Sequence, residues 1–113
     1  MADSCLFCKI LKGEIPADKL YEDEDILAFR DIAPQAPLHF LVIPKKHIGG
    51  PGNVGADDER LIGKVVRMGG KIAKKEGIEH YRIVMNHGEQ AGQSVFHVHM
   101  HVLGGRSMSW PPG

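Results

Sequence analysis

The stretch Phe96-His-Val-His-Met-His-Val-Leu103 decides how this chain folds, because histidine alternates with apolar residues along it. Alternation with a period of two is typical of a β-strand, whose successive side chains point to opposite faces. We therefore expect the imidazoles of His97, His99 and His101 on one face, about 6–7 Å apart. The opposite face is apolar, which favours a central strand over a solvated one. Three imidazoles in a row can supply a nucleophile, an acid and an orienting partner near neutral pH.

The composition limits the class of protein. With 113 residues the chain can build one hydrophobic core, so we expect a single domain over residues 1–113. Its 14 acidic and 14 basic residues cancel, which predicts no nucleic-acid wrapping and no membrane adsorption, and a small-molecule or protein partner is expected instead. No stretch is long and apolar enough for a signal peptide or a membrane span, so we expect a soluble, cytoplasmic protein, with the nucleus as an alternative location. The two cysteines are then expected to be reduced.

The remaining patterns predict an α+β fold. A short helix is expected over residues 4–12, capped by Ser4 and ended by Gly13. A long helix is expected over 57–76, with Asp57 and Asp58 at its start. Its apolar stripe comprises Leu61, Ile62, Val65, Val66, Ile72 and Ala73. Strands over 19–21, 26–29, 39–43, 81–85 and 95–103 are expected to form a five-stranded, mainly antiparallel sheet.

Glycines within the long helix suggest a close contact. Gly63, Gly69 and Gly70 each cost about 1 kcal/mol relative to alanine in a helix interior. Such glycines indicate close packing against the protein's own sheet or against a second subunit, and the sequence leaves both open. We expect a two-fold dimer formed partly through helix 57–76 and the strand near 81–85. Trp110, close to the C-terminus, is expected to dock against the protein rather than remain exposed.

The histidine stretch and several shorter motifs resemble the histidine triad (HIT) superfamily. The matching segments are Gly92-Gln-Ser-Val-Phe-His-Val-His-Met-His-Val-Leu103, Glu14-Ile-Pro16, Asp31-Ile32, Pro34-Gln-Ala-Pro37, His39-Phe-Leu-Val-Ile-Pro-Lys-Lys-His47, Leu103-Gly-Gly-Arg106 and Trp110-Pro-Pro-Gly113. The chain is similar to the Hint branch, also known as protein kinase C interacting proteins. This resemblance implies a HIT-like fold and a homodimeric hydrolase. Its activity would be that of a purine nucleoside phosphoramidase, which cleaves the P–N bond of AMP or GMP phosphoramidates.

The resemblance also implies catalytic roles. His99 matches the family nucleophile, whose attack gives a nucleotidyl-histidine intermediate that water then hydrolyses. His101 is expected to act as an acid or to contact a phosphate oxygen, because an amine leaves only when protonated. His97 and His39 are expected to fix the tautomer and orientation of the other rings. Ser94 belongs to the same catalytic set, as a donor toward the phosphate.

The nucleotide is expected to contact three groups of residues. Phosphate donors would come from Asn86, Gln93, Ser94 and Val95, together with His99 and His101. The resemblance places the ribose on Asp31. It places the base among Leu6, Phe7, Ile15, Phe29 and Ile32, with Trp110 as a further contact. Read without the family, these apolar residues are ordinary core.

Cys5 and Cys8 form a Cys-x-x-Cys pair, a spacing suited to a zinc site when two more ligands lie elsewhere. The resemblance supplies His47 and His97 as those ligands, and the expected cofactor is a structural zinc ion with no organic cofactor. The alternative is a pair of buried thiols on the short helix.

Two other functions stay open. A zinc-dependent hydrolase could use two of the alternating histidines as metal ligands, although no acidic residue follows Glu89 in the sequence. A non-enzymatic adaptor could use the nucleotide site for regulation, with regulatory protein partners.

Overall fold

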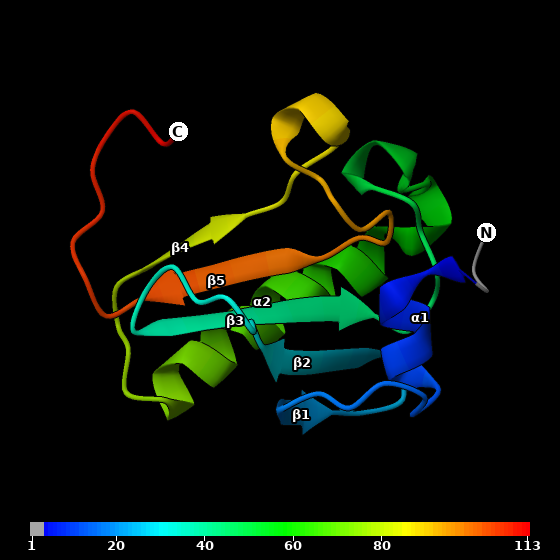
Figure 1. The fold of residues 1–113 in the computed structure, drawn as a ribbon, viewed down its shortest axis with the longest axis horizontal. Coiled ribbons are helices and arrows are strands. Elements are labelled where there is room, and N and C mark those ends of the chain that lie inside the picture. The colour runs from blue at the N-terminus through cyan, green and yellow to red at the C-terminus, as the bar shows by residue number, and fades with distance from the viewer. Residues whose placement is uncertain (1–3) are drawn as a thin grey trace.

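The computed structural model describes residues 4–113. Over these residues the helices and strands are α1 (Leu6–Leu11), β1 (Lys19–Glu22), β2 (Ile26–Arg30), β3 (Leu38–Pro44), α2 (Glu59–Lys75), β4 (Tyr81–Val84) and β5 (Met100–Gly104). Short 3-10 turns lie at η2 (Pro51–Asn53), η3 (Ala56–Asp58) and η4 (Glu89–Ala91). The strands form one sheet in the order β1-β2-β3-β5-β4, and all neighbours are antiparallel (Figure 1). The expected α+β class with a five-stranded sheet, one long helix and one short helix is confirmed for the described residues.

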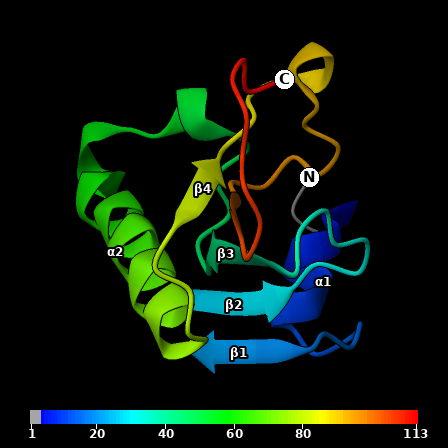
Figure 2. The same ribbon diagram turned by 90° about the vertical axis from the view of Figure 1, so that its left-hand side faces the viewer.

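The sheet separates two layers of apolar packing. Helix α2 lies across one face and α1 lies against the other (Figure 2). The alternation in β3 explains this arrangement: Phe40 and Val42 pack in the cluster under α2, whereas Leu41 and Ile43 pack in the cluster that includes α1. All seven residues of β3 are buried, as expected for a central strand covered on both faces.

The histidine strand is shorter than expected. It was predicted over residues 95–103, but β5 begins at Met100, so His97 and His99 lie in the segment before the strand. Pairing with β3 ends at Met100 and pairing with β4 ends at His101. The apolar partners of the alternation, Val98 and Met100, are nevertheless fully buried.

Helix α1 begins one residue later than the Ser4 cap would require. Its N-cap is Cys5, whose backbone is extended and whose Sγ accepts a hydrogen bond from the N–H of Cys8 over 3.4 Å. The expected Ser4 cap is therefore wrong. Gly13 follows the helix with a φ of +79°, a conformation that favours glycine and ends the helix as predicted.

Helix α2 also begins later than predicted, at Glu59, after the 3-10 turn η3. Asp58 precedes it but makes no side-chain cap bond, and its carboxylate instead binds Lys46 Nζ over 2.7 Å. The buried residues of the helix are Val65, Met68, Gly69, Ile72 and Ala73. Val66 was expected in this stripe, but its side chain lies off the sheet-facing side and is 44% exposed.

The three glycines of α2 have different surroundings. A Cβ on Gly69 would lie 2.4 Å from Met100 Cε, so this glycine lets the helix approach its own sheet. A Cβ on Gly70 would lie 2.7 Å from the hydroxyl of Tyr81 on β4. A Cβ on Gly63 would meet no atom within 4 Å. The close approach is thus to the chain's own sheet at Gly69, while Gly63 faces open space.

The C-terminal tail leaves the body of the protein after β5 (Figure 1). Arg82 on β4 donates a hydrogen bond to the carbonyl of Ser109 over 2.9 Å. Trp110, one residue further, is 82% exposed, so the expectation that it docks is wrong for the chain as described. Among residues 4–113, no helix combines the length and apolar character needed to cross a membrane.

Candidate functional site

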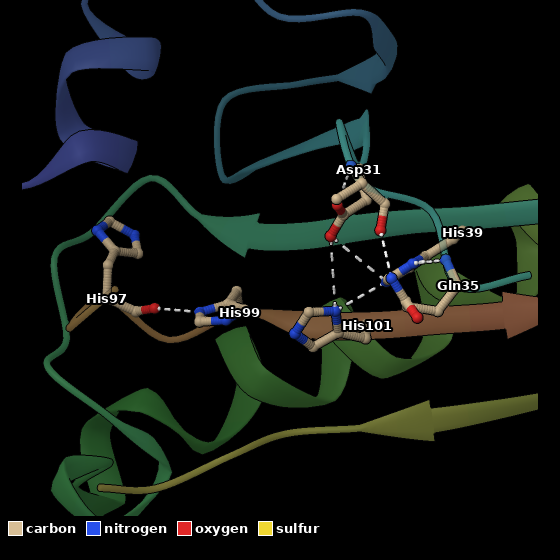
Figure 3. A network of polar contacts seen from close by, with 7 residues as sticks. Asp31, Gln35, His39, His97, His99 and His101 are labelled. Carbon is tan, nitrogen blue, oxygen red and sulfur yellow. Dashed lines mark hydrogen bonds and ion pairs between the residues drawn. The ribbon is translucent and has the colours of Figure 1, made fainter. Parts of the chain in front are cut away.

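Four histidines lie along one side of the sheet, on the central strands β3 and β5 and the segment before β5 (Figure 3). His39 projects from β3, and His101 projects from β5 opposite Leu41. The ring centroids of His39 and His101 are 5.2 Å apart, and those of His99 and His101 are 5.0 Å apart. The rings of His39, His99 and His101 are therefore neighbours, on β3, the segment before β5 and β5, whereas the ring of His97 lies in another cluster.

His99 is held in one tautomer by the main chain. Its Nδ1 lies 2.8 Å from the carbonyl oxygen of His97, and a carbonyl can only accept, so Nδ1 carries the proton (Figure 3). In the neutral ring Nε2 then keeps its lone pair. The ring is buried, with 6% of the residue exposed, and it forms a T-shaped pair with the Phe7 ring at a centroid distance of 5.1 Å. This arrangement presents one neutral nitrogen as a potential nucleophile.

His39 and His101 are joined by a directional hydrogen bond. The N–H of Gln35 donates to His39 Nδ1 over 3.0 Å, so the proton of the neutral His39 ring lies on Nε2. That Nε2 donates to His101 Nδ1 over 2.9 Å, which leaves the proton of a neutral His101 ring on its own Nε2. Asp31 Oδ2 lies 3.5 Å from His39 Nε2 and 3.9 Å from His101 Nδ1. We call this series of hydrogen bonds, from the Gln35 N–H through His39 to His101, the histidine relay. It leaves an Nε2–H donor on His101.

Both rings of this relay favour the neutral form. Burial, together with the neighbouring His99 and His39, lowers the pKa of His101 to about 4, against the opposing effect of Asp31. Burial also lowers the pKa of His39, again opposed by Asp31. At neutral pH the two rings are therefore uncharged hydrogen-bonding groups.

The ring of His97 belongs to a different cluster. Its Nδ1 lies 3.5 Å from Cys5 Sγ, 3.6 Å from Cys8 Sγ and 3.1 Å from His47 Nδ1. Cys8 Sγ lies 3.3 Å from His47 Nδ1, and all four ligand atoms are within 4.8 Å of one another. The expected orienting role of the His97 ring toward the other triad rings is not seen, because its carbonyl, not its imidazole, contacts His99.

This cluster fits a tetrahedral zinc ion. Zinc bonds of about 2.0–2.1 Å to nitrogen and 2.3 Å to sulfur place neighbouring ligand atoms about 3.3–3.8 Å apart. The observed separations between the thiol and imidazole atoms are close to these values. His97 Nε2 donates to the carbonyl of Pro44 over 2.8 Å, so the lone pair of Nδ1 points into the cluster. Two thiols and two imidazoles are the donor set that a structural zinc site uses.

The loop before the histidines holds the expected phosphate donors, and they differ in availability. Gln93 is 3% exposed, and its side-chain amide donates to the carbonyls of Gly49 and Val95 over 2.8 and 3.1 Å. Its N–H donates to the carbonyl of Gly88 over 3.0 Å, so the donors of Gln93 are used within the loop. In this structure the loop itself therefore uses the donors of Gln93, and its expected contact with phosphate stays a prediction. Ser94 is exposed, and Asn86 and Val95 are partly buried.

The expected base contacts divide into core and surface. Phe7 and Phe29 are each 5% exposed and pack edge to face at 5.6 Å in the cluster around α1, against which Ile15 also packs. These residues are part of the core, and their contact with a base stays a prediction. Leu6 is 44% exposed and Ile32 is fully exposed, so both can meet a ligand. Trp110 lies on the exposed tail.

Three positioning groups were missed by sequence reasoning, the N–H of Gln35 and the carbonyls of Pro44 and His97. All three are main-chain groups, so residue type gives no signal for them. Asp31, expected at the ribose, lies beside the His39 to His101 hydrogen bond as well. Its other oxygen accepts from the N–H of Ala33 over 2.8 Å.

An antiparallel sheet crossed by one long helix, with a histidine relay on its central strands, defines a histidine triad domain. Residues 12–108 match the HIT domain model, and the chain belongs to the HIT domain family. It is 50% identical to an uncharacterized HIT-like protein of Synechococcus elongatus over 114 residues, covering 100% of both. A HIT family hydrolase from Legionella pneumophila is 53% identical, with a TM-score of 0.95 and coverage of 97% of this chain and 100% of that one. A HIT family hydrolase from Clostridium thermocellum is 41% identical, with a TM-score of 0.92 and coverage of 95% of each chain.

Proposed function

We propose that this protein is a hydrolase of the Hint type, which cleaves the P–N bond of purine nucleoside 5'-monophosphoramidates through a nucleotidyl-histidine intermediate. The observation that carries the proposal is the hydrogen bond from His99 Nδ1 to the carbonyl of His97, because it leaves Nε2 as a neutral nucleophile. A neutral nitrogen approaches an anionic phosphoramidate with less repulsion than a carboxylate does. The similarity to proteins described as HIT family hydrolases supports the same class of reaction.

In the first step, His99 Nε2 attacks phosphorus. The P–N bond breaks, its electron pair stays on the leaving nitrogen, and that nitrogen takes one proton from water to leave as an amine. The new bond joins phosphorus to His99 Nε2, and the ring, still protonated at Nδ1, becomes an imidazolium that the His97 carbonyl stabilises. In the second step water attacks phosphorus and returns a proton to solvent. The products are a nucleoside 5'-monophosphate and neutral His99.

His101 had two expected roles, acid or phosphate contact, and the relay favours the second. A neutral ring with its proton on Nε2 donates a hydrogen bond, whereas loss of that proton would leave an imidazolate. We therefore assign His101 Nε2–H as a hydrogen-bond donor to a phosphate oxygen of the phosphoramidate. Main-chain and side-chain groups of Asn86, Ser94 and Val95 are the further donors, and Asp31 remains the proposed ribose contact.

The decisive experiment compares turnover of adenosine 5'-phosphoramidate with that of a dinucleoside polyphosphate. The proposal expects the phosphoramidate to be the better substrate by kcat/KM. Preference for the dinucleoside polyphosphate would place the chain in another branch of the family. Nucleotide binding without turnover of either compound would favour the adaptor function.

One observation favours the zinc-dependent hydrolase as a second candidate. Ligand atoms of Asp31, His39 and His101 lie within 4.8 Å of one another, which supplies the carboxylate that the sequence near the histidines lacks. A chelator separates the two functions. Covalent catalysis by His99 survives removal of metal at temperatures where the fold survives, whereas metal-dependent hydrolysis is lost.

We also propose that Cys5, Cys8, His47 and His97 hold one structural zinc ion. Such an ion would join α1 to the end of β3 and to the segment before β5, and thereby stabilise the fold. Metal analysis of protein purified without chelator tests this, with one zinc per chain as the expected result.

A homodimer completes the proposal. Val66 on α2 and Tyr81 and Ile83 on β4 are 44%, 41% and 43% exposed. Gly63 lies seven residues before Gly70, which faces Tyr81, so it lies on the same side of the helix. These residues form an apolar face over α2 and β4 that a second copy of the chain would cover.

A further inference from the structure

The loop over residues 31–37 sets the tautomers of the relay. The N–H of Gln35 is the group that keeps His39 Nδ1 unprotonated. Within the loop, the side-chain amide of Gln35 donates to the carbonyl of Ala33 over 3.0 Å, and Asp31 accepts from the N–H of Ala33. The outer residues of this loop are exposed, and Ile32 is fully so. The loop therefore has little packing of its own to fix the position of the Gln35 N–H.

The chain just after β5 contacts this loop at two points. Gly105 has a φ of +89°, and a Cβ there would lie 2.9 Å from Pro37 Cβ, so glycine allows the chain to pass close to the loop. Arg106 Nε then donates to the carbonyl of Gln35 over 3.0 Å. Arg106 Nη1 donates to the carbonyl of Ser107 over 3.1 Å, which holds the guanidinium in place. Gln35 is thus bound on one side to His39 and on the other to Arg106.

We propose that Arg106 is a positioning residue for the histidine relay. By holding the Gln35 carbonyl it keeps the preceding N–H on His39 Nδ1, and this N–H fixes the protons of His39 and His101 on their Nε2 atoms. Loss of the Arg106 bond frees the loop to move and lets His39 populate the other tautomer, in which Nε2 no longer donates to His101. The catalytic part of this inference rests on the proposed function, whereas the tautomer part does not.

The kinetic test uses Arg106→Ala, Arg106→Lys and Arg82→Ala. Arg82 is the matched control because it also donates to a tail carbonyl, that of Ser109, but does not contact the loop. A typical hydrogen bond contributes about 0.5–1.5 kcal/mol, so Arg106→Ala is expected to lower kcat for adenosine 5'-phosphoramidate about three- to tenfold with KM little changed. Arg106→Lys keeps a donor and is expected to recover most of kcat, and Arg82→Ala is expected to match the wild type.

The second readout is the nitrogen chemical shift of the imidazoles, measured by NMR at pH 7 on the same variants. Wild type and Arg106→Lys are expected to show His39 protonated at Nε2 only, and Arg106→Ala to show a mixture of tautomers. An unchanged His39 spectrum in Arg106→Ala, or the same changes in Arg82→Ala, overturns the proposal. If the wild type hydrolyses no phosphoramidate, the proposed function fails, but the His39 spectrum still decides the role of Arg106.

Discussion

The Nδ1–H of His99 points at the carbonyl oxygen of His97, 2.8 Å away and two residues earlier in the same chain. The group that orients the proposed nucleophile is therefore a main-chain carbonyl two residues earlier in the chain. No long-range contact has to form for this hydrogen bond, because the turn of the segment before β5 brings the two atoms together. The ring orientation that the proposed reaction needs is therefore set without a substrate.

Replacement of His99 is expected to abolish catalysis. His99→Gly removes the attacking nitrogen, and no neighbouring group can replace it, so kcat should fall by at least about three orders of magnitude, or about 4 kcal/mol in the barrier. Nucleotide binding, measured by calorimetry with AMP, should persist. His80→Ala, at an exposed position outside the site, is the control and should keep full activity. Retention of more than about a tenth of wild-type turnover in His99→Gly would show that another residue attacks.

Acid should destabilise the fold through His101. Its pKa is lowered to about 4 in the folded protein, against an ordinary value of 6.5, so the unfolded chain binds a proton first as the pH falls. The stability that neutral His101 contributes is fully present above about pH 6.5 and is lost progressively between about pH 6.5 and 4. Urea unfolding at pH 7 and at pH 4.5 should show a smaller loss of stability for His101→Gln than for the wild type. Equal losses would contradict the lowered pKa.

The proposed zinc site should matter for stability more than for chemistry. Cys8→Ser removes one of the four ligands and should lower the melting temperature far more than it lowers turnover at 25 °C. A chelator should lower the melting temperature of the wild type and leave that of Cys8→Ser unchanged. Substoichiometric zinc in purified protein, with thiols that react fully in the folded state, would leave Cys5 and Cys8 as apolar fillers of α1.

A charge on the α2 and β4 face should prevent dimerisation. Val66→Glu places a carboxylate in the proposed interface, and sedimentation at micromolar concentration should then show a monomer where the wild type shows a dimer. Arg67→Glu is the matched control, because Arg67 lies beside Tyr21 and Asp23 at the β1 side of the same helix. The wild type sedimenting only at 12.4 kDa would defeat the dimer proposal.

The fold could be predicted because its signals are periodic and local. Alternating residues predicted the strands, and spaced apolar residues predicted α2, within a few positions of their observed bounds. The predictions were wrong at positions whose structure depends on contacts between distant parts of the chain. β5 starts at Met100, where its pairing with β3 ends, and the residue types along this stretch do not indicate that point. Trp110 is exposed, and its docking was wrongly predicted because nothing in the tail's own sequence shows which surface it can reach.

The sequence predicts which residues gather at the site, but it does not predict the hydrogen bonds between them. Alternation and the family motifs predicted which histidines gather on the sheet, and His39 and His101 do meet. The directions of their protons depend on main-chain groups of Gln35 and His97, which every residue type carries. The inward ring of His97 depends on Cys5 and Cys8, more than eighty residues earlier in the chain.

His97 serves two sites with two separate parts of one residue. Its imidazole faces the thiols, whereas the atom that His99 binds is a backbone oxygen that any amino acid would supply. A substitution at position 97 can therefore delete the metal ligand and keep the acceptor for the nucleophile. For divergence within a family, this means that a lineage could lose the proposed metal site step by step, starting with either cysteine, while the main-chain acceptor for His99 is kept. The proposed ion site and the proposed nucleophile are thus neighbours in the fold that can evolve independently.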